Sequence, residues 1–324
     1  MTPQLSHPPL SLRVSVTSRC SLRCTYCMPA NGVPTGVREE VLSFKETLRF
    51  VCELKARYGL AHVRITGGEP LVRPGIDRLV AMFAAVGVSD LAMTTNGQQL
   101  AGLAKRLMRA GLSRINISLD TLNPETFASI TRGGSLEKTL AGIAAAQEAE
   151  LQPVKLNVVV IRGRNDNEVA GLVRFAIEND CQIRFLELMP IGVAAAGFKD
   201  HFVSSAEVRE RLWREFTLTA LPVEPHGTSR NFAANDRHGR SAIIGFISPY
   251  SEPFCAGCWR LRLTATGVLM GCLARSEGIP LGPLLRSDRD MDGEALAVAV
   301  EQALGMKRHN GEFIQPQAMV GIGG

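Results

Sequence analysis

The sequence has 324 residues, of which 45% are hydrophobic and 21% are charged, an ordinary balance for a globular protein that can bury a sizeable core. Its net charge of 36 − 31 = +5 is only mildly basic, and an anionic small substrate accounts for it as well as nucleic acid does. Neither a secretory signal nor an apolar run of membrane-spanning length is visible, so we expect a cytoplasmic protein that binds no membrane and no nucleic acid.

Short β-branched runs alternate with longer helical patterns from residue 10 to about residue 216. The expected strands are Leu10–Val16, His62–Thr66, Leu91–Thr95, Arg114–Leu119, Lys155–Ile161 and Gln182–Leu188. The expected helices are Ser43–Tyr58, Ile76–Val86, Leu100–Ala110, Leu136–Glu150, Asn167–Asn179 and Ser205–Phe216. Such a series of β–α units predicts a parallel sheet, either a partial barrel or a doubly wound sheet, with its working groups at the carboxyl ends of the strands.

The pattern changes near residue 217, where a stretch rich in Pro, Gly, Asn and His begins. Beyond it, Ser241–Ile247 and Arg260–Leu269 are expected strands of a smaller region, and Glu294–Leu304 is an expected helix. We therefore divide the chain into a domain at 1–216 and a C-terminal region at 217–324.

Six of the eight cysteines form two triplets, and in a chain without a signal peptide this clustering favours metal binding over disulfides. Cys20, Cys24 and Cys27 follow the first expected strand with C-x3-C-x2-C spacing. Thiolates spaced in this way are typical of an iron–sulfur site. Three cysteines on a cubane cluster leave one iron open, which indicates chemistry rather than electron storage alone.

The second triplet consists of Cys255, Cys258 and Cys272 and leaves three interpretations open. The first two cysteines could be a thioredoxin-type redox pair. The triplet could also hold structural zinc if Cys181 or a histidine supplied a fourth ligand. We favour a second iron–sulfur cluster, again with one open iron.

A turn with the sequence Thr66-Gly67-Gly68-Glu69-Pro70 follows the second expected strand. Its glycines allow a close backbone approach or positive φ, although a tight β–α turn alone would explain them. Together with the first cysteine triplet, this turn resembles the radical S-adenosylmethionine superfamily. That resemblance implies a 4Fe–4S cluster whose open iron chelates the amino-acid end of S-adenosylmethionine, with the turn contacting its amino group. Reductive cleavage then gives a 5′-deoxyadenosyl radical that abstracts hydrogen from a substrate.

Over nearly its whole length the chain resembles the GTP 3′,8-cyclase family of molybdenum cofactor biosynthesis. The matching stretches include LRVSVTSRCSLRCTYCMP, VRITGGEPLVR, MTTNG, INISLDTL, KLNVVV, RFLELMP, GFISPYSEPFCAGCWRLRLTATGVLMGCL and the terminal IGG. The resemblance implies a partial (β/α)6 TIM-type barrel with an appended smaller α+β region carrying the second cluster. It also implies two 4Fe–4S clusters, S-adenosyl-L-methionine as cofactor and GTP as substrate.

The activity implied is a lyase-type cyclisation of GTP to (8S)-3′,8-cyclo-7,8-dihydroguanosine 5′-triphosphate, started by abstraction of the ribose 3′ hydrogen. The resemblance also implies that a downstream enzyme of the same biosynthesis receives the product and that the enzyme forms a homodimer, while the electron donor is not indicated. Other interpretations are a two-cluster relative acting on another nucleotide or a peptide, and a zinc-stabilised nucleic-acid-binding protein.

The resemblance also implies roles for single residues. The positions that match GTP contacts are Arg13, Arg64, Thr95, Lys155, Arg260 and Arg262. The positions that match S-adenosylmethionine contacts are Tyr26, Gly68, Ser118 and Met189, and Gly323 and Gly324 match a tail needed for catalysis. Trp259 replaces the Asn that the family usually carries, and we expect it beside the guanine site, where it could shift substrate preference.

Overall fold

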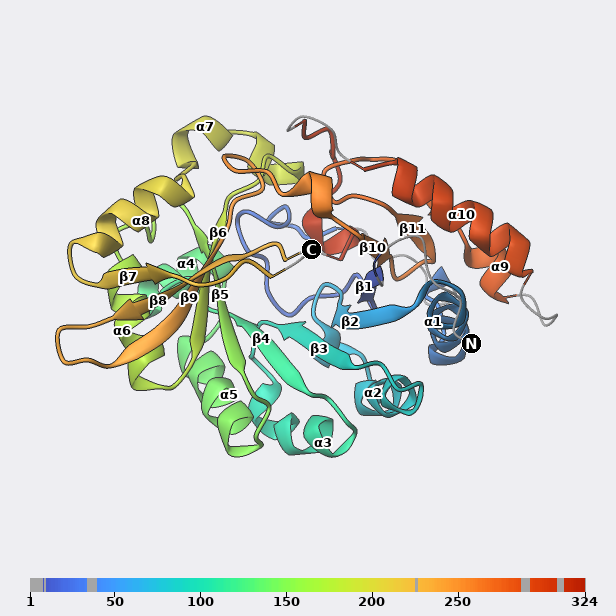
Figure 1. Ribbon diagram of the computed structural model, residues 1–324, viewed down its shortest axis with the longest axis horizontal. Coiled ribbons are helices and arrows are strands. Elements are labelled where there is room, and N and C mark those ends of the chain that lie inside the picture. Colours follow the sequence, from blue (N-terminus) through green and yellow to red (C-terminus); the bar gives the residue numbers. More distant parts are fainter. Residues whose placement is uncertain are drawn as a thin grey trace.

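The computed structural model describes Pro8 and residues 10–33, 40–224, 227–286, 292–307 and 312–323. The strands of this part of the chain form one 12-stranded sheet in the order β12-β11-β10-β1-β2-β3-β4-β5-β6-β9-β8-β7. Figure 1 shows the sheet curving around a central opening, with helices on its outer side and the C-terminal segment near the middle.

The strands are β1 (Leu10–Ser15), β2 (Leu60–Thr66), β3 (Asp90–Thr95), β4 (Arg114–Ser118), β5 (Val154–Val160), β6 (Gln182–Glu187), β7 (Thr217–Ala220), β8 (Arg230–Asn235), β9 (Ser241–Ile247), β10 (Arg260–Leu263), β11 (Val268–Met270) and β12 (Ile279–Pro280). The α-helices are α1 (Phe44–Tyr58), α2 (Ile76–Ala85), α3 (Ala104–Arg109), α4 (Pro124–Thr131), α5 (Leu136–Glu148), α6 (Val169–Glu178), α7 (Phe198–His201), α8 (Ser205–Trp213), α9 (Gly282–Arg286) and α10 (Gly293–Gly305). Short 3-10 turns lie at Pro70–Val72, Leu100–Gly102, Gly192–Ala195, Cys255–Gly257 and Met319–Gly321.

The predicted partial barrel is confirmed, with strands β1 to β6 pairing in parallel in chain order. The ends of the expected elements agree to within a few residues, apart from Leu100–Ala110. That stretch is a 3-10 turn followed by the shorter helix α3, and the turn ends at Gly102, a poor helix former. A capping box begins α1, since the backbone N–H of Glu46 donates to Ser43 Oγ at 3.2 Å and the backbone N–H of Ser43 donates to Glu46 Oε2 at 2.6 Å.

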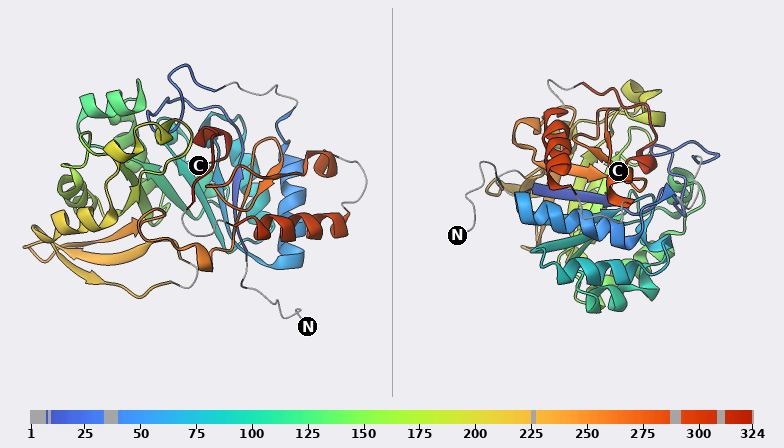
Figure 2. Two further views of the ribbon diagram at one scale, coloured as in Figure 1. Left: turned by 90° about the horizontal axis from the view of Figure 1, so that it is seen from above. Right: turned by 90° about the vertical axis from the view of Figure 1, so that its right-hand side faces the viewer.

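The C-terminal strands continue this sheet on both sides. β9 pairs in parallel with β6, and β10 pairs in parallel with β1, so the parallel arc extends beyond its six predicted strands. The β7–β8–β9 hairpins lie at one end of the molecule, and α9 and α10 lie with β11 at the other (Figures 1 and 2). Residues after 217 are therefore divided between the two edges of the sheet.

Two details after residue 217 differ from the prediction. Arg260–Leu269 is not one strand but the hairpin β10–β11, because the chain turns at Gly267, whose φ of +86° suits glycine. The preceding Pro- and Gly-rich stretch contains the strands β7 and β8, which the sequence analysis does not predict. β7 is mostly exposed, so it lacks the apolar alternation by which a strand is recognised.

One main hydrophobic core, with two smaller clusters beside it, spans the described part of the chain. It runs from Leu10 and Phe50 through the barrel strands to Phe246 and continues to Leu261 and Val300 in the C-terminal region. No helix among the described residues has the length and apolar character needed to cross a bilayer.

Candidate active site

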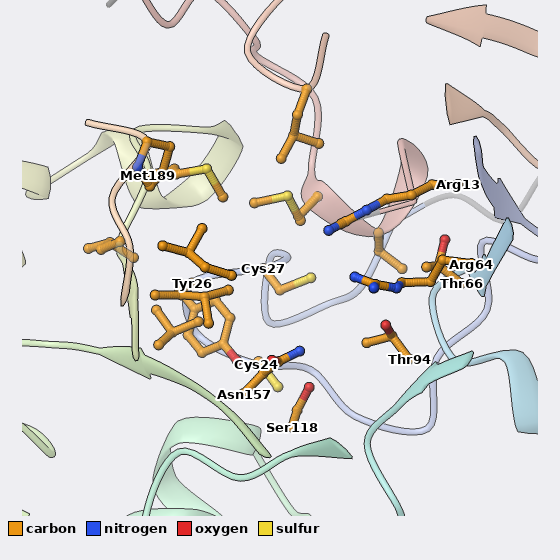
Figure 3. A pocket seen from close by; sticks show the side chains of 18 of the residues that line it. Arg13, Cys24, Tyr26, Cys27, Arg64, Thr66, Thr94, Ser118, Asn157 and Met189 are labelled. Carbon is orange, nitrogen blue, oxygen red and sulfur yellow. The ribbon is translucent and has the colours of Figure 1, made fainter. Parts of the chain in front are cut away.

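A cavity of about 300 Å³ lies at the carboxyl ends of the parallel strands and is lined by the cysteines of both triplets. Most of the predicted site residues also line it, namely Arg13, Tyr26, Arg64, Gly68, Thr95, Ser118, Met189, Arg260 and Arg262. Figure 3 shows several of these side chains converging on the same space from different strands. Lys155 and Gly323 are not among the lining residues, and Gly324 lies outside the described residues.

The loop that carries the first triplet is held by its own backbone and by α4. The N–H of Cys27 donates to the carbonyl of Cys24 at 2.9 Å, and the N–H of Thr25 donates to the carbonyl of Ile130 at 2.9 Å. Burial raises the pKa of the Cys27 thiol to about 12, and burial followed by the charge of Asp120 raises that of Cys24 well above its usual value. In the absence of a ligand, burial therefore favours the neutral thiol at these two residues.

The Gly-Gly turn after β2 packs directly against this loop. A side chain at Gly68 would come within 2.3 Å of the carbonyl oxygen of Arg19, and one at Gly67 within 2.7 Å of that of Thr17. The N–H of Gly68 donates to the carbonyl of Thr17 at 2.6 Å. Close backbone approach, rather than positive φ, is thus the reason for both glycines.

The donor set fits an iron–sulfur cluster. Within the described residues no group of three or more His, Cys, Asp or Glu side chains is arranged for a single metal ion. The first triplet nevertheless lies close enough for its thiols to influence one another's pKa. In a cubane each thiolate binds a different iron, so a wider triangle of soft thiolates suits a cluster.

The second triplet is placed by a 3-10 turn and the β10–β11 hairpin. Cys255 and Cys258 flank the turn, where the N–H of Cys258 donates to the carbonyl of Cys255 at 3.1 Å. Burial alone would raise the pKa of Cys258, but the charges of Lys307 and then Arg260 lower it below its usual value. Lys307 Nζ also donates to the carbonyl of Gly271 at 2.6 Å, beside Cys272. Cys258 is thus placed to favour thiolate.

Cationic side chains line the cavity wall between the two triplets. Burial and the neighbouring guanidinium groups lower the pKa of Arg13 and Arg64, and the Nε of each has no hydrogen-bond partner among the described residues. The same causes lower the pKa of Arg184 to about 10. Buried, clustered and incompletely paired guanidinium groups indicate a site for a polyanion.

Arg184 lines the cavity, yet the sequence analysis does not single it out. The sequence does contain a signal for Arg184, because burying a charged residue in an apolar parallel strand is costly unless its charge is compensated. Lys155, in contrast, is half-buried near Arg184 and Arg114, and burial lowers its pKa to about 8. Lys155 lies two residues before Asn157 on β5 and is therefore further from the carboxyl end of that strand. Asn157 lines the cavity, and Lys155 does not.

The hydroxyl of Thr95 is already committed within the protein. It donates to Glu69 Oε1 at 2.7 Å and accepts from the N–H of Gly97 at 3.1 Å.

The C-terminal tail enters the same region, because Arg262 Nη1 donates to the carbonyl of Gly323 at 2.7 Å. A side chain at Gly323, whose φ is +70°, would meet Ser15 Cβ at 2.8 Å. The tail therefore docks between the ends of β1 and β2.

Trp259 lies where the sequence analysis does not expect it. Strand alternation directs Arg260 and Cys258 to the cavity, whereas Trp259 packs against the main hydrophobic core and is absent from the cavity lining. The replacement of Asn by Trp at this position therefore leaves the wall of the cavity intact.

The fold and the cysteine loop define the radical S-adenosylmethionine class. Residues 14–176 match the Radical SAM superfamily, and residues 181–313 match the family named Molybdenum Cofactor Synthesis C. The structure of SuiB from Streptococcus suis, bound to S-adenosylmethionine, aligns with a TM-score of 0.59 and 16% identity, covering 88% of this chain and 64% of SuiB. HemN, coproporphyrinogen III oxidase from Escherichia coli, aligns with a TM-score of 0.51 and 13% identity, covering 76% of this chain and 73% of HemN. Both likenesses concern the fold.

Sequence relatives identify the family more closely. The GTP 3′,8-cyclase of Pseudomonas putida is 44% identical over 93% of this chain and 90% of its own length. Those of Petrotoga mobilis and Moorella thermoacetica are 40% and 42% identical, each over 97% of both chains. The chain belongs to the GTP 3′,8-cyclase family.

Proposed function

We propose that this protein cyclises GTP at the cavity between the two cysteine triplets, forming the 3′,8-cyclo product. The observation that carries the proposal is the placement of Arg13, Arg64, Arg260 and Arg262 in one cavity with both triplets. An anionic nucleotide and two open-iron clusters account for that combination. The relatives named GTP 3′,8-cyclase support the same substrate.

The cofactor end of the cavity is formed by the first triplet and its neighbours. When bound there, a 4Fe–4S cluster with S-adenosylmethionine would supply the 5′-deoxyadenosyl radical that abstracts the ribose 3′ hydrogen. Gly68 offers backbone beside the cysteine loop, and Ser118 and Met189 project from the ends of β4 and β6. Tyr26 closes this end from within the cysteine loop and is fixed through its hydroxyl.

The substrate end holds the nucleotide by charge. The guanidinium groups of Arg13, Arg64 and Arg260 match phosphate oxygens, and each charge-assisted contact contributes about 1.5–3 kcal/mol. The second triplet would hold the open iron that binds the guanine. Lys155 sits behind this wall and adds to its positive potential rather than lining the cavity. Thr95 supports the site through Glu69, because its hydroxyl is engaged there.

The C-terminal tail completes the site. Arg262 binds the carbonyl of Gly323, so the tail and the substrate arginines are in direct contact. We assign Gly323 the role of positioning Arg262 at the nucleotide. Gly324 lies outside the described residues, and its catalytic role rests on the resemblance alone. We also propose that residues 1–216 and 217–324 are the two functional regions. The protein would act in the cytoplasm as a homodimer, and a later enzyme of molybdenum cofactor biosynthesis would receive the product.

Anaerobic incubation with GTP, S-adenosylmethionine and a reductant tests the proposal. Mass analysis should detect an isomer of GTP that forms together with 5′-deoxyadenosine. Trp259→Asn, which changes a side chain outside the cavity, should convert GTP as the wild type does. If the wild type cleaves S-adenosylmethionine and leaves GTP unconverted, the substrate is another nucleotide or a peptide.

A further inference from the structure

Asp120 is a buried carboxylate at the cofactor end of the cavity whose charge the proposed function has not used. It follows β4, is 4% exposed and lines the cavity. Its Oδ2 accepts from the hydroxyl of Tyr26 at 2.8 Å, and its Oδ1 accepts from the backbone N–H of Val159 at 2.9 Å. Asp120 therefore connects the first cysteine loop to the end of β5.

The two hydrogen-bond donors to the Asp120 carboxylate, the Tyr26 hydroxyl and the Val159 N–H, are both neutral. Among the described residues Asp120 forms no ion pair with a lysine, arginine or histidine, whereas Asp90, at the start of β3, pairs with Arg114 at 2.5 Å. A buried carboxylate without a cation is costly unless something else compensates its charge. Two hydrogen bonds also leave acceptor capacity on its oxygens.

Glu69, the other buried carboxylate at this end, is more fully occupied. Its oxygens accept from the N–H of Leu71 at 3.0 Å, the hydroxyl of Thr95 at 2.7 Å and the N–H of Asn96 at 2.7 Å. These bonds fix the Gly-Gly turn. Asp120 is thus the carboxylate with more freedom to serve a ligand.

S-adenosylmethionine, the cofactor of this class, carries a positive charge on its sulfonium sulfur. Its amino and carboxylate groups are taken by the open iron, so the sulfonium is the charge left for the protein to meet. We propose that Asp120 is the counter-charge by which the cavity selects the sulfonium of S-adenosylmethionine over the neutral thioether of S-adenosylhomocysteine. This inference rests on the proposed function, because it requires the cofactor to bind beside the first triplet.

A purely structural role for Asp120 has a different signature. If the carboxylate only tied Tyr26 to β5, its loss would weaken both ligands equally. If it supplies charge, its loss weakens the sulfonium compound alone. The ratio of the two dissociation constants therefore separates the roles, and it is independent of turnover.

The experiment uses anaerobic, cluster-loaded full-length protein and equilibrium dialysis with labelled S-adenosylmethionine and labelled S-adenosylhomocysteine. Asp120→Asn keeps the shape of the side chain and removes its charge. Tyr26→Phe removes the hydrogen bond to Asp120 and keeps the charge. Asp77→Asn, at a surface ion pair with Arg106, is the matched control.

We expect the wild type to prefer S-adenosylmethionine by about tenfold or more, the size of one charge-assisted contact, and Asp120→Asn to lose most of that preference. Tyr26→Phe should weaken the binding of both compounds without changing their ratio, and Asp77→Asn should retain both the affinities and the ratio. An unchanged ratio in Asp120→Asn overturns the inference. Should that variant fail to load its cluster, equal affinity of the wild type for the two compounds overturns it as well. A wild type that binds neither compound would instead contradict the proposed function.

Discussion

The two cysteine triplets face the same cavity but lie in opposite electrostatic surroundings. The thiols of Cys24 and Cys27 have raised pKa values because they are buried, and Asp120 adds to the effect at Cys24. At Cys258 the cations Lys307 and Arg260 outweigh burial and lower the pKa. The pKa of the same residue type is thus shifted in opposite directions, upward by burial at Cys24 and Cys27 and downward by neighbouring cations at Cys258.

This contrast matches the charges of the two molecules that the site is proposed to bind. A sulfonium cofactor suits the end that carries Asp120 and Glu69, and a nucleoside triphosphate suits the end that carries Arg13 and Arg64. The protein thereby sorts two ligands within one cavity. Each would be repelled from the wrong end, so charge supports the order that the two cysteine triplets set.

Removing one cysteine from each triplet should give the largest difference between the two ends. Cys24→Ala should abolish cleavage of S-adenosylmethionine, because no open-iron cluster would remain to bind it. Cys258→Ala should lose GTP conversion while still producing some 5′-deoxyadenosine. The measurements are the yields of 5′-deoxyadenosine and of the GTP isomer, with iron content as the control for cluster loss. Equal loss of both products in both variants would contradict the division of labour.

Much of this contrast could be predicted from the sequence. Cysteine spacing and the Gly-Gly turn are local patterns, so they indicate the cofactor end without any knowledge of packing. The βα alternation likewise predicts the barrel because hydrophobic periodicity is a local signal. The joining of β9 and β10 to opposite edges depends on pairing between distant segments, and no local pattern reports it.

Single residues show the same limit. Trp259 stands between Cys258 and Arg260 in the sequence, yet strand alternation turns it into the core. Asp120 and Arg184 become prominent only when the barrel brings them to the cavity. Sequence resemblance also grouped Lys155 with the substrate contacts, although its side chain is not among those lining the cavity.

A substitution at Arg64 sharpens the comparison from the substrate end. Arg64→Met should weaken GTP binding by about 10- to 100-fold, the loss of one charge-assisted contact, and leave S-adenosylmethionine binding unchanged. It should also raise the free energy of unfolding without ligand, because a buried cation beside other cations is replaced by an apolar side chain. Ligand titration and denaturant unfolding measure the two effects. Arg106→Met is the control on the surface, and a loss of affinity for both ligands would contradict the separation.

Substitution of Lys307 should have the smallest and most selective effect, because Lys307 influences the second triplet without lining the cavity. Its ammonium group is the foremost cation lowering the pKa of Cys258, so Lys307→Met should raise that pKa. Thiolate is the form that binds iron, and the second site should therefore need a higher pH than in the wild type to load its cluster. At neutral pH the variant should contain less iron per chain, while cleavage of S-adenosylmethionine continues.

Lys307→Arg separates this charge effect from the structural bond to Gly271, because it keeps a cation in place of the ammonium group. Iron and sulfide content after anaerobic reconstitution across a pH series is the measurement. If Lys307→Arg loads its second cluster as the wild type does and Lys307→Met requires higher pH, the cation sets the loading of that site. If both variants lose iron equally at every pH, the hydrogen bonds of Lys307 hold the loop and its charge has no part in the contrast between the triplets.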